Sequence, residues 1–217
     1  MGPAKSSDSG PTRLELERAA QGDQAAWAAL LGRHRDRLHR MVALRLDPRL
    51  QRRLDVEDVL QEAFLEAASH LVDYLQKPSI PFFLWLRGIV GNVLLALHRQ
   101  HLGTKMRDAG REVALYRGAL PEASSAVLAA QLLGRDTRPS EAAMRAERKL
   151  LLQQALNTMD PLDREVLALR HFEQLNRAET AQVLGIAEAA AAKRYLRAVK
   201  RLKEILQSMP GAGGIEP

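Results

Sequence analysis

A run of basic side chains near the C-terminal end of the chain could bind the phosphates of a nucleic acid. Residues 187–206 contain neither proline nor glycine, and their apolar side chains recur at helical spacing, which predicts a single helix. The other faces of this helix carry mostly cations: Lys193, Arg194, Arg197, Lys200, Arg201 and Lys203. A helix with one apolar face and several basic faces suits the major groove of DNA.

The residues that precede this helix predict a tight turn. Ala181 is small enough for two helices to approach closely, and Gly185 adopts a left-handed turn at little cost. Leu184 and Ile186 are expected to pack the joint from either side. The pattern indicates a helix-turn-helix, although a packed corner with a solvated basic face would leave the same pattern.

A second charged group, of opposite sign, lies in residues 55–64. Asp55 is expected to cap a helix that runs to about Leu71. Apolar side chains form one face of this helix, and polar and acidic ones form the other: Glu57, Asp58, Gln61 and Glu62. An acidic strip is notable in a chain that is otherwise basic, although the residues alone favour a solvated helix face.

The elements that position these groups are all predicted to be helical. Helical periodicity also covers residues 14–20, 24–46, 82–101, 140–159 and 160–172, and no segment alternates as a strand would. We therefore predict an all-α fold with two helical domains, residues 13–102 and 140–208. Residues 103–139 are expected to be a partly ordered linker with a helix near 123–133. The tails, 1–12 and 209–217, are expected to be disordered or loose.

The composition of the chain favours a polyanionic partner and excludes several classes of site. The 217 residues carry a formal net charge of +6, which favours a polyanionic partner. The chain has no cysteine, which excludes disulfides and thiolate zinc sites, and His98 with His101 does not complete a metal site. There is no glycine-rich phosphate loop and no nucleophile beside a base. We expect a cytoplasmic protein that is not an enzyme, with no cofactor, small-molecule substrate, secretion signal or membrane span.

Three stretches of the sequence are similar to those of a known family. Residues 55–64, DVEDVLQEAF, follow the pattern D-x-E-D-[LV]-x-Q-E-x-F almost letter for letter. A second motif of the family, W-L-x-x-I-x-x-N, is matched by Trp85-Leu86 with Ile89 and Asn92. The third stretch, residues 156–206, is similar to the C-terminal part of the family's sequences and includes the predicted helix-turn-helix. In these motifs the chain resembles bacterial RNA polymerase sigma factors of the extracytoplasmic-function (ECF) subfamily.

The resemblance implies a role for each domain. The first domain would bind core RNA polymerase, at a coiled coil of its largest subunit, through Asp55, Glu57, Asp58, Gln61 and Glu62. It would also bind the promoter −10 element, for which the candidate residues are Lys77, Ser79, Arg87, Asn92, His98 and Arg99. The second would bind the −35 element, with the candidates Glu188, Lys193, Arg194, Arg197 and Lys200. Phe83 and Trp85 are expected in the core, and an anti-sigma protein is a possible further partner.

The sequence also departs from the family pattern. Ala96 replaces a frequent aspartate, and the basic run after it is reduced to His98-Arg99-Gln100-His101. Ala190–Ala192 cannot hydrogen-bond to base edges, so we expect the −35 element to be read partly through DNA shape, with Glu188 as the best candidate for a base contact. The alternative function is a dimeric helix-turn-helix regulator that binds intact duplex DNA.

Overall fold

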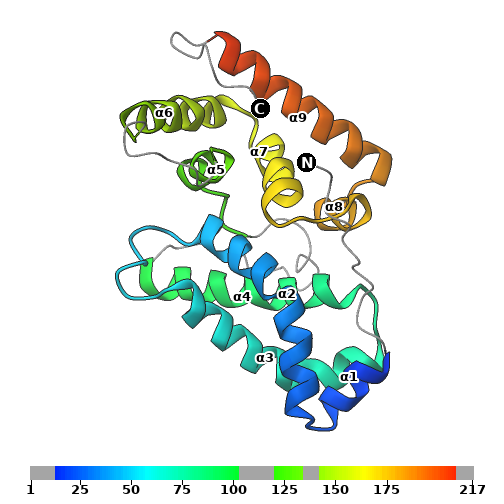
Figure 1. The fold of residues 1–217 in the computed structure, drawn as a ribbon. Helices are drawn as coiled ribbons and strands as arrows, with labels where there is room; N and C mark the ends of the chain where they lie inside the picture. Colours follow the sequence, from blue (N-terminus) through cyan, green and yellow to red (C-terminus); the bar gives the residue numbers. More distant parts are fainter. Residues whose placement is uncertain (1–12, 103–119, 134–141, 209–217) are drawn as a thin grey trace.

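The computed structural model describes residues 13–102, 120–133 and 142–208, and each regular element in these ranges is a helix (Figure 1). The expected all-α fold is confirmed. The two tails and most of the expected linker lie outside the described residues, as does Ser140, the expected start of a helix.

The first four helices pack around one apolar core. They are α1 (Arg13–Ala20), α2 (Gln24–Arg45), α3 (Val56–Gln76) and α4 (Phe82–Leu102). Leu38, Leu60 and Leu86 are fully or almost fully buried between them. Burial of such side chains contributes about 1.5–3 kcal/mol each, which is why their helical spacing determines which faces meet.

Helix α3 continues past Leu71, where the sequence analysis ended it. Its last turn is held by Tyr74, whose ring stacks on Trp85 at a centroid distance of 4.7 Å. The Tyr74 hydroxyl donates a hydrogen bond to the carbonyl of Ile80 at 2.9 Å. Phe83 is buried and Trp85 is half-buried against the same core, as expected.

Helix α4 is long and apolar enough to cross a membrane when judged by length and composition alone. However, 61% of its candidate segment is buried inside the protein. Its apolar surface is therefore that of a core helix, which α2 and α3 cover.

The remaining helices form a second group with its own core. They are α5 (Ser125–Leu132), α6 (Ala142–Thr158), α7 (Pro161–Leu167), the short π-helix η2 (Ala168–Phe172), α8 (Arg177–Leu184) and α9 (Glu188–Ser208). Leu128, Leu156 and Ala198 are completely buried in this core. Pro161 occupies the first turn of α7, where its missing N–H leaves no intrahelical bond unmade.

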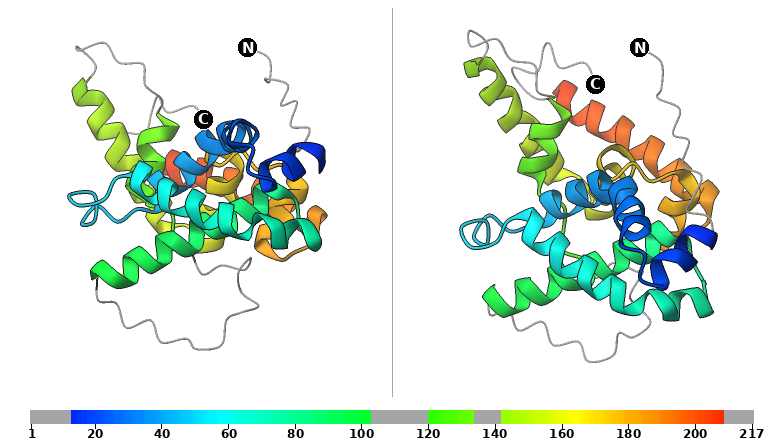
Figure 2. Two further views of the ribbon diagram at one scale, coloured as in Figure 1. Left: turned by 90° about the horizontal axis from the view of Figure 1, so that it is seen from below. Right: turned by 60° about the horizontal axis from the view of Figure 1, so that its bottom comes forward.

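The two groups of helices are docked against each other, with α2 between them (Figures 1 and 2). Leu44 of α2 belongs to the second core, and its carbonyl accepts a hydrogen bond from the Ser124 amide at 2.8 Å. Leu169 and Leu175 in turn belong to the first core. Helix α5 lies within the expected linker but packs on α6. The proposed domain boundaries stay a prediction.

Candidate nucleic-acid interface

The turn between α8 and α9 has the geometry that the sequence predicts. Gly185 is left-handed, with φ 65° and ψ 34°, and the Ile186 amide bonds back to the Ala181 carbonyl at 3.0 Å. Ala181 is buried and Leu184 is half-buried. Ile186 differs from the expectation, since 37% of its surface is exposed.

Helix α9 presents a basic face to solvent. Lys193, Arg197 and Lys200 are exposed and lie opposite the buried side of the helix. Glu188 is exposed in the first turn. Arg194 differs from these residues, since it is half-buried and pairs with Asp163 of α7 at 3.2 Å.

The alanines near the start of α9 do not share one environment. Ala190 is exposed, whereas Ala191 is only 2% exposed because it packs inside the joint with α8. Ala192 is half-buried. A longer side chain at position 191 would therefore disturb the joint before it reached a ligand.

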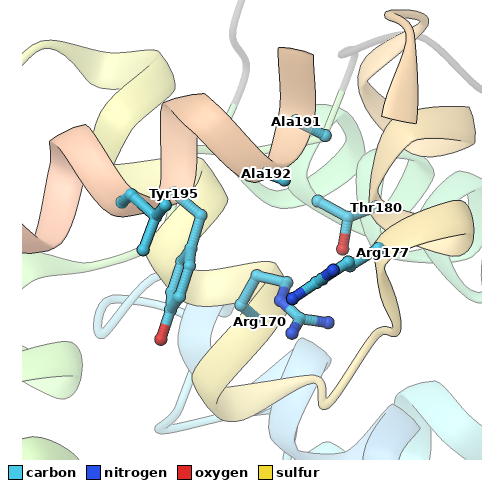
Figure 3. Close-up of a pocket in the computed structure, with 7 residues that line it drawn as sticks. Arg170, Arg177, Thr180, Ala191, Ala192 and Tyr195 are labelled. Atoms are coloured by element: carbon cyan, nitrogen blue, oxygen red, sulfur yellow. The ribbon is translucent and has the colours of Figure 1, made fainter. Parts of the chain in front are cut away.

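A small basic cavity lies beside this face (Figure 3). Its volume is about 100 Å³, and η2, α8 and α9 surround it. Two arginines and a hydroxyl line it, Arg170, Arg177 and Thr180, together with Ala191, Ala192, Tyr195 and Leu196. This cavity could not be predicted from the sequence, because its two arginines belong to different elements.

The neighbouring histidine adds no charge to this basic surface. The ring of His171 lies 2.8 Å from the Tyr195 hydroxyl. Burial and the charge of Arg170 lower the pKa of His171 below its ordinary 6.5, so the imidazole is neutral at pH 7.

The acidic residues of α3 are exposed, and two of them also hold the helix together. The Asp55 carboxylate accepts from the Asp58 amide at 2.9 Å, and that of Asp58 accepts from the Asp55 amide at 2.8 Å. Glu57 pairs with Arg35 of α2 at 2.5 Å, with both side chains about half exposed. Gln61 and Glu62 are exposed and make no side-chain hydrogen bond or ion pair in the described part of the chain.

The residues expected at the −10 element are divided between the surface and the interior. Lys77, Ser79 and Arg99 are exposed at the two ends of α4, and Asn92 is half-buried. The ring of His98 accepts a hydrogen bond from the Asp47 amide at 3.4 Å. Burial lowers the pKa of His98 despite the nearby Asp47 carboxylate, so the ring is neutral at pH 7.

Comparison with known proteins decides the family. A family model described as "Sigma-70, region 4" matches residues 149–202, which contain the helix-turn-helix. The RNA polymerase sigma factor NccH of Alcaligenes xylosoxydans xylosoxydans is 31% identical over 193 residues, 88% of this chain and 92% of NccH. The chain belongs to the RNA polymerase sigma factors.

Other relatives narrow this to the ECF subfamily. The ECF RNA polymerase sigma factor SigD of Mycobacterium tuberculosis is 28% identical over 186 residues, 86% of this chain and 79% of SigD. The chain spans only 34% of one longer sigma-factor relative. A solved structure of CnrH in complex with the cytosolic domain of CnrY shares the fold, with a TM-score of 0.54 and 23% identity over 91% of this chain and 98% of that one. Sigma factors are not enzymes, and these matches do not favour a dimeric regulator.

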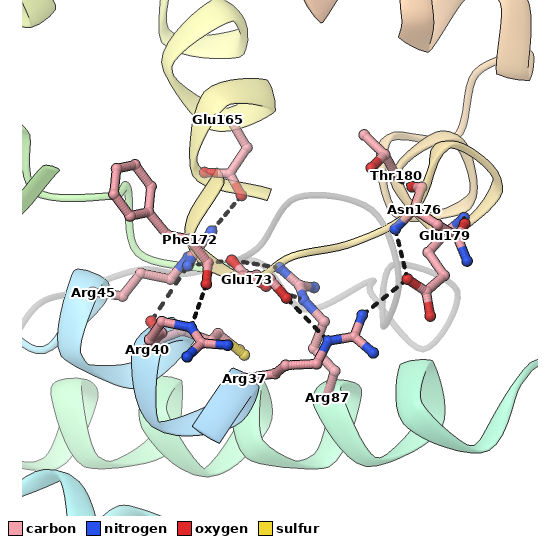
Figure 4. A network of polar contacts seen from close by, with 11 residues as sticks. Arg37, Arg40, Arg45, Arg87, Glu165, Phe172, Glu173, Asn176, Glu179 and Thr180 are labelled. Carbon is pink, nitrogen blue, oxygen red and sulfur yellow. Dashed lines mark hydrogen bonds and ion pairs between the residues drawn. The ribbon is translucent and has the colours of Figure 1, made fainter. Parts of the chain in front are cut away.

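In this sigma factor, Arg87 is not available at the surface. Its guanidinium is buried and binds the Glu173 carboxylate at 2.6 Å and 3.4 Å (Figure 4). Arg45 pairs with the other side of the same carboxylate at 2.6 Å. A role of Arg87 at the −10 element stays a prediction, and it requires Glu173 to leave.

This ionic cluster was not predicted from the sequence, although α2 carries a signal for it. Between Leu31 and Leu38, α2 has no apolar side chain, and His34 and Arg37 occupy its buried face instead. Arg45 continues that face one turn after Met41. A charged side chain at a core position indicates a buried partner. No group of three or more His, Asp or Glu placed to hold a metal ion occurs among the described residues.

Proposed function

We propose that this sigma factor binds core RNA polymerase and directs it to promoters in the cytoplasm. The observation that carries the proposal is the match to NccH along 92% of that protein, so both helical groups are matched and not the helix-turn-helix alone. Polymerase would perform the chemistry, while this chain would supply positioning and capture unpaired bases.

The exposed acidic face of α3 is the proposed polymerase site. Its residues are Asp55, Glu57, Asp58, Gln61 and Glu62. Exposed ion pairs contribute at most about 1 kcal/mol each, so several must act together to hold a basic partner. Since Asp55 and Asp58 also cap the helix, Glu57 and Glu62 are the better positions for a binding test.

The proposed −35 surface is the basic face of α9 with the neighbouring cavity. Lys193, Arg197 and Lys200 would hold phosphates on one strand, and Arg170 with Arg177 would hold a further phosphate at the start of α8. Ala190 offers no hydrogen bond to a base, which supports reading by DNA shape, with Glu188 as the candidate base contact.

The proposed −10 surface lies at the two ends of α4. Lys77, Ser79 and Arg99 are the exposed members, and Asn92, His98 and Arg87 lie deeper. CnrH, which shares the fold, was solved in complex with the cytosolic domain of CnrY, and we propose a partner protein for this chain as well. An anti-sigma protein is the corresponding proposed partner here.

Binding to purified core RNA polymerase tests the function. We expect a stable complex, and specific transcripts from a pool of bacterial promoter fragments that core polymerase alone does not give. A chain that leaves core polymerase inactive, but binds intact palindromic DNA as a dimer, would be a regulator of the alternative class.

A further inference from the structure

The carboxylate of Glu173 is completely buried between the two helical groups (Figure 4). Its oxygens accept from Arg45 of α2 at 2.6 Å and from Arg87 of α4 at 2.6 Å and 3.4 Å. The backbone is shaped to place this side chain: the Glu173 amide makes a π-type bond to Ala168 at 3.0 Å, and Gln174 has a positive φ of 56°. Such unusual backbone is often found at functional sites.

Two more arginines of α2 bind the segment around Glu173, residues 172–179. Arg37 donates to the Glu173 carbonyl at 3.0 Å and to the Glu179 carboxylate at 2.9 Å. Arg40 donates to the Phe172 carbonyl at 2.6 Å. The first helical group thus presents four guanidinium groups to one short segment of the second: Arg37, Arg40, Arg45 and Arg87.

We infer that these four arginines are a binding surface for the DNA phosphate backbone, and that Glu173 occupies it in the docked arrangement as an internal substitute for phosphate. The inference rests on the proposed function. Guanidinium groups bind carboxylates and phosphates with the same paired geometry. When the two helical groups separate, the arginines become exposed and strongly favour a polyanion.

The promoter itself requires that separation. The names of the −10 and −35 elements give their positions, which differ by about 25 base pairs. In B-form DNA this separation is about 85 Å, at about 3.4 Å per base pair. A compact chain of 217 residues has a radius of gyration of about 17 Å and a diameter of about 45 Å. The docked molecule cannot reach both elements, so the contacts of Glu173 must break before the promoter is bound.

We call the contacts of Glu173 with the arginines of the first helical group the latch. Neutralising Glu173 in the full chain tests whether the latch holds the two helical groups together. The chain has no cysteine, so labels can be attached at Ser69→Cys on α3 and Gln207→Cys on α9, both exposed. We expect E173Q to lengthen the distance between the two spin labels, as measured by double electron–electron resonance. E147Q, which removes one exposed charge from α6 of the same group, should keep the wild-type distance. Circular dichroism should show unchanged helix content in both variants.

DNA binding tests the arginine surface. We expect E173Q to bind a duplex with an unpaired central stretch more tightly than E147Q. Its dependence of log affinity on log salt should also be steeper, by about 0.9 for each phosphate newly bound. Adding R40A to E173Q should reverse part of that gain. An unchanged label distance in E173Q would overturn the latch, and an open E173Q that binds DNA no better than E147Q would overturn the phosphate surface.

The outcome is independent of the test with polymerase. If E173Q opens and gains DNA affinity while the chain ignores core polymerase, the latch stands and the proposed function fails. If the chain binds polymerase while E173Q stays closed, the proposed function stands and the latch fails.

Discussion

Carboxylate–arginine pairs occur in two regions of this sigma factor, and burial separates their roles. Glu173 with Arg45 is completely buried between the helical groups, whereas Glu57 with Arg35 is about half exposed on α3 and α2. In water such a pair gains little, because solvent screens both charges. In the interior, each charge depends on the other, since removing one leaves the second desolvated and unpaired. Buried pairs therefore hold the molecule together, and exposed pairs remain available to a partner.

The largest effect is expected from removing a buried arginine. R45A leaves Glu173 and Glu165 without a guanidinium that lies 2.6 Å and 2.5 Å from them. We expect a loss of about 3–5 kcal/mol from the docked arrangement, seen as two separate unfolding transitions in urea. R49A, which removes an exposed pair with Asp47, is the control and should leave the stability nearly unchanged, because solvent screens this pair. Equal effects of the two variants would contradict the comparison.

Acid should weaken the docking through the same carboxylate. Burial acts to raise the pKa of Glu173, but Arg45 and Arg87 outweigh it and hold the pKa below the ordinary 4.5. The contribution of Glu173 to docking is thus fully present above pH 4.5 and is lost as the pH falls from there through the lowered pKa. The distance between labels should lengthen over this range in the wild type. The same titration of E173Q should be flat, and a parallel response would assign the opening to other groups.

Reversing the exposed acids should affect polymerase binding without affecting the fold. In E57K/E62K the acidic face becomes basic, and we expect core polymerase affinity to fall about tenfold or more, or about 1.4 kcal/mol. Fluorescence anisotropy of the labelled chain measures this. E147K reverses an exposed charge elsewhere and should bind as the wild type does. An unchanged affinity of E57K/E62K would remove the acidic face from the interface.

The smallest expected effect is local, at the turn of the helix-turn-helix. Gly185 is left-handed, so G185A should destabilise the second helical group by about 1–2 kcal/mol. Thermal unfolding followed by circular dichroism measures the change. G32A is a control in α2, because a methyl group there meets open space and φ is not positive. It should be neutral or slightly stabilising, and a loss equal to that of G185A would mean that backbone conformation is not the cause.

What could be predicted from the sequence follows from how local the signals are. The turn at Gly185, the cap at Asp55 and the apolar stripe of α9 each depend on neighbours within a few residues, and all three are present as expected. The buried cluster joins residues 45, 87 and 173, which no local period relates. The place of Arg45 on the buried face of α2 indicates a buried partner but does not identify it, so only the tertiary structure shows that Arg87 is occupied.

The most direct measurement is the label distance between Ser69→Cys and Gln207→Cys before and after core RNA polymerase is added. The exposed acids of α3 should capture polymerase, and the buried contacts of Glu173 should break so that the helical groups can reach separate promoter elements. We predict one short distance in the free chain and a clearly longer one in the complex. A complex that retains the short distance, or no complex at all, would contradict this account.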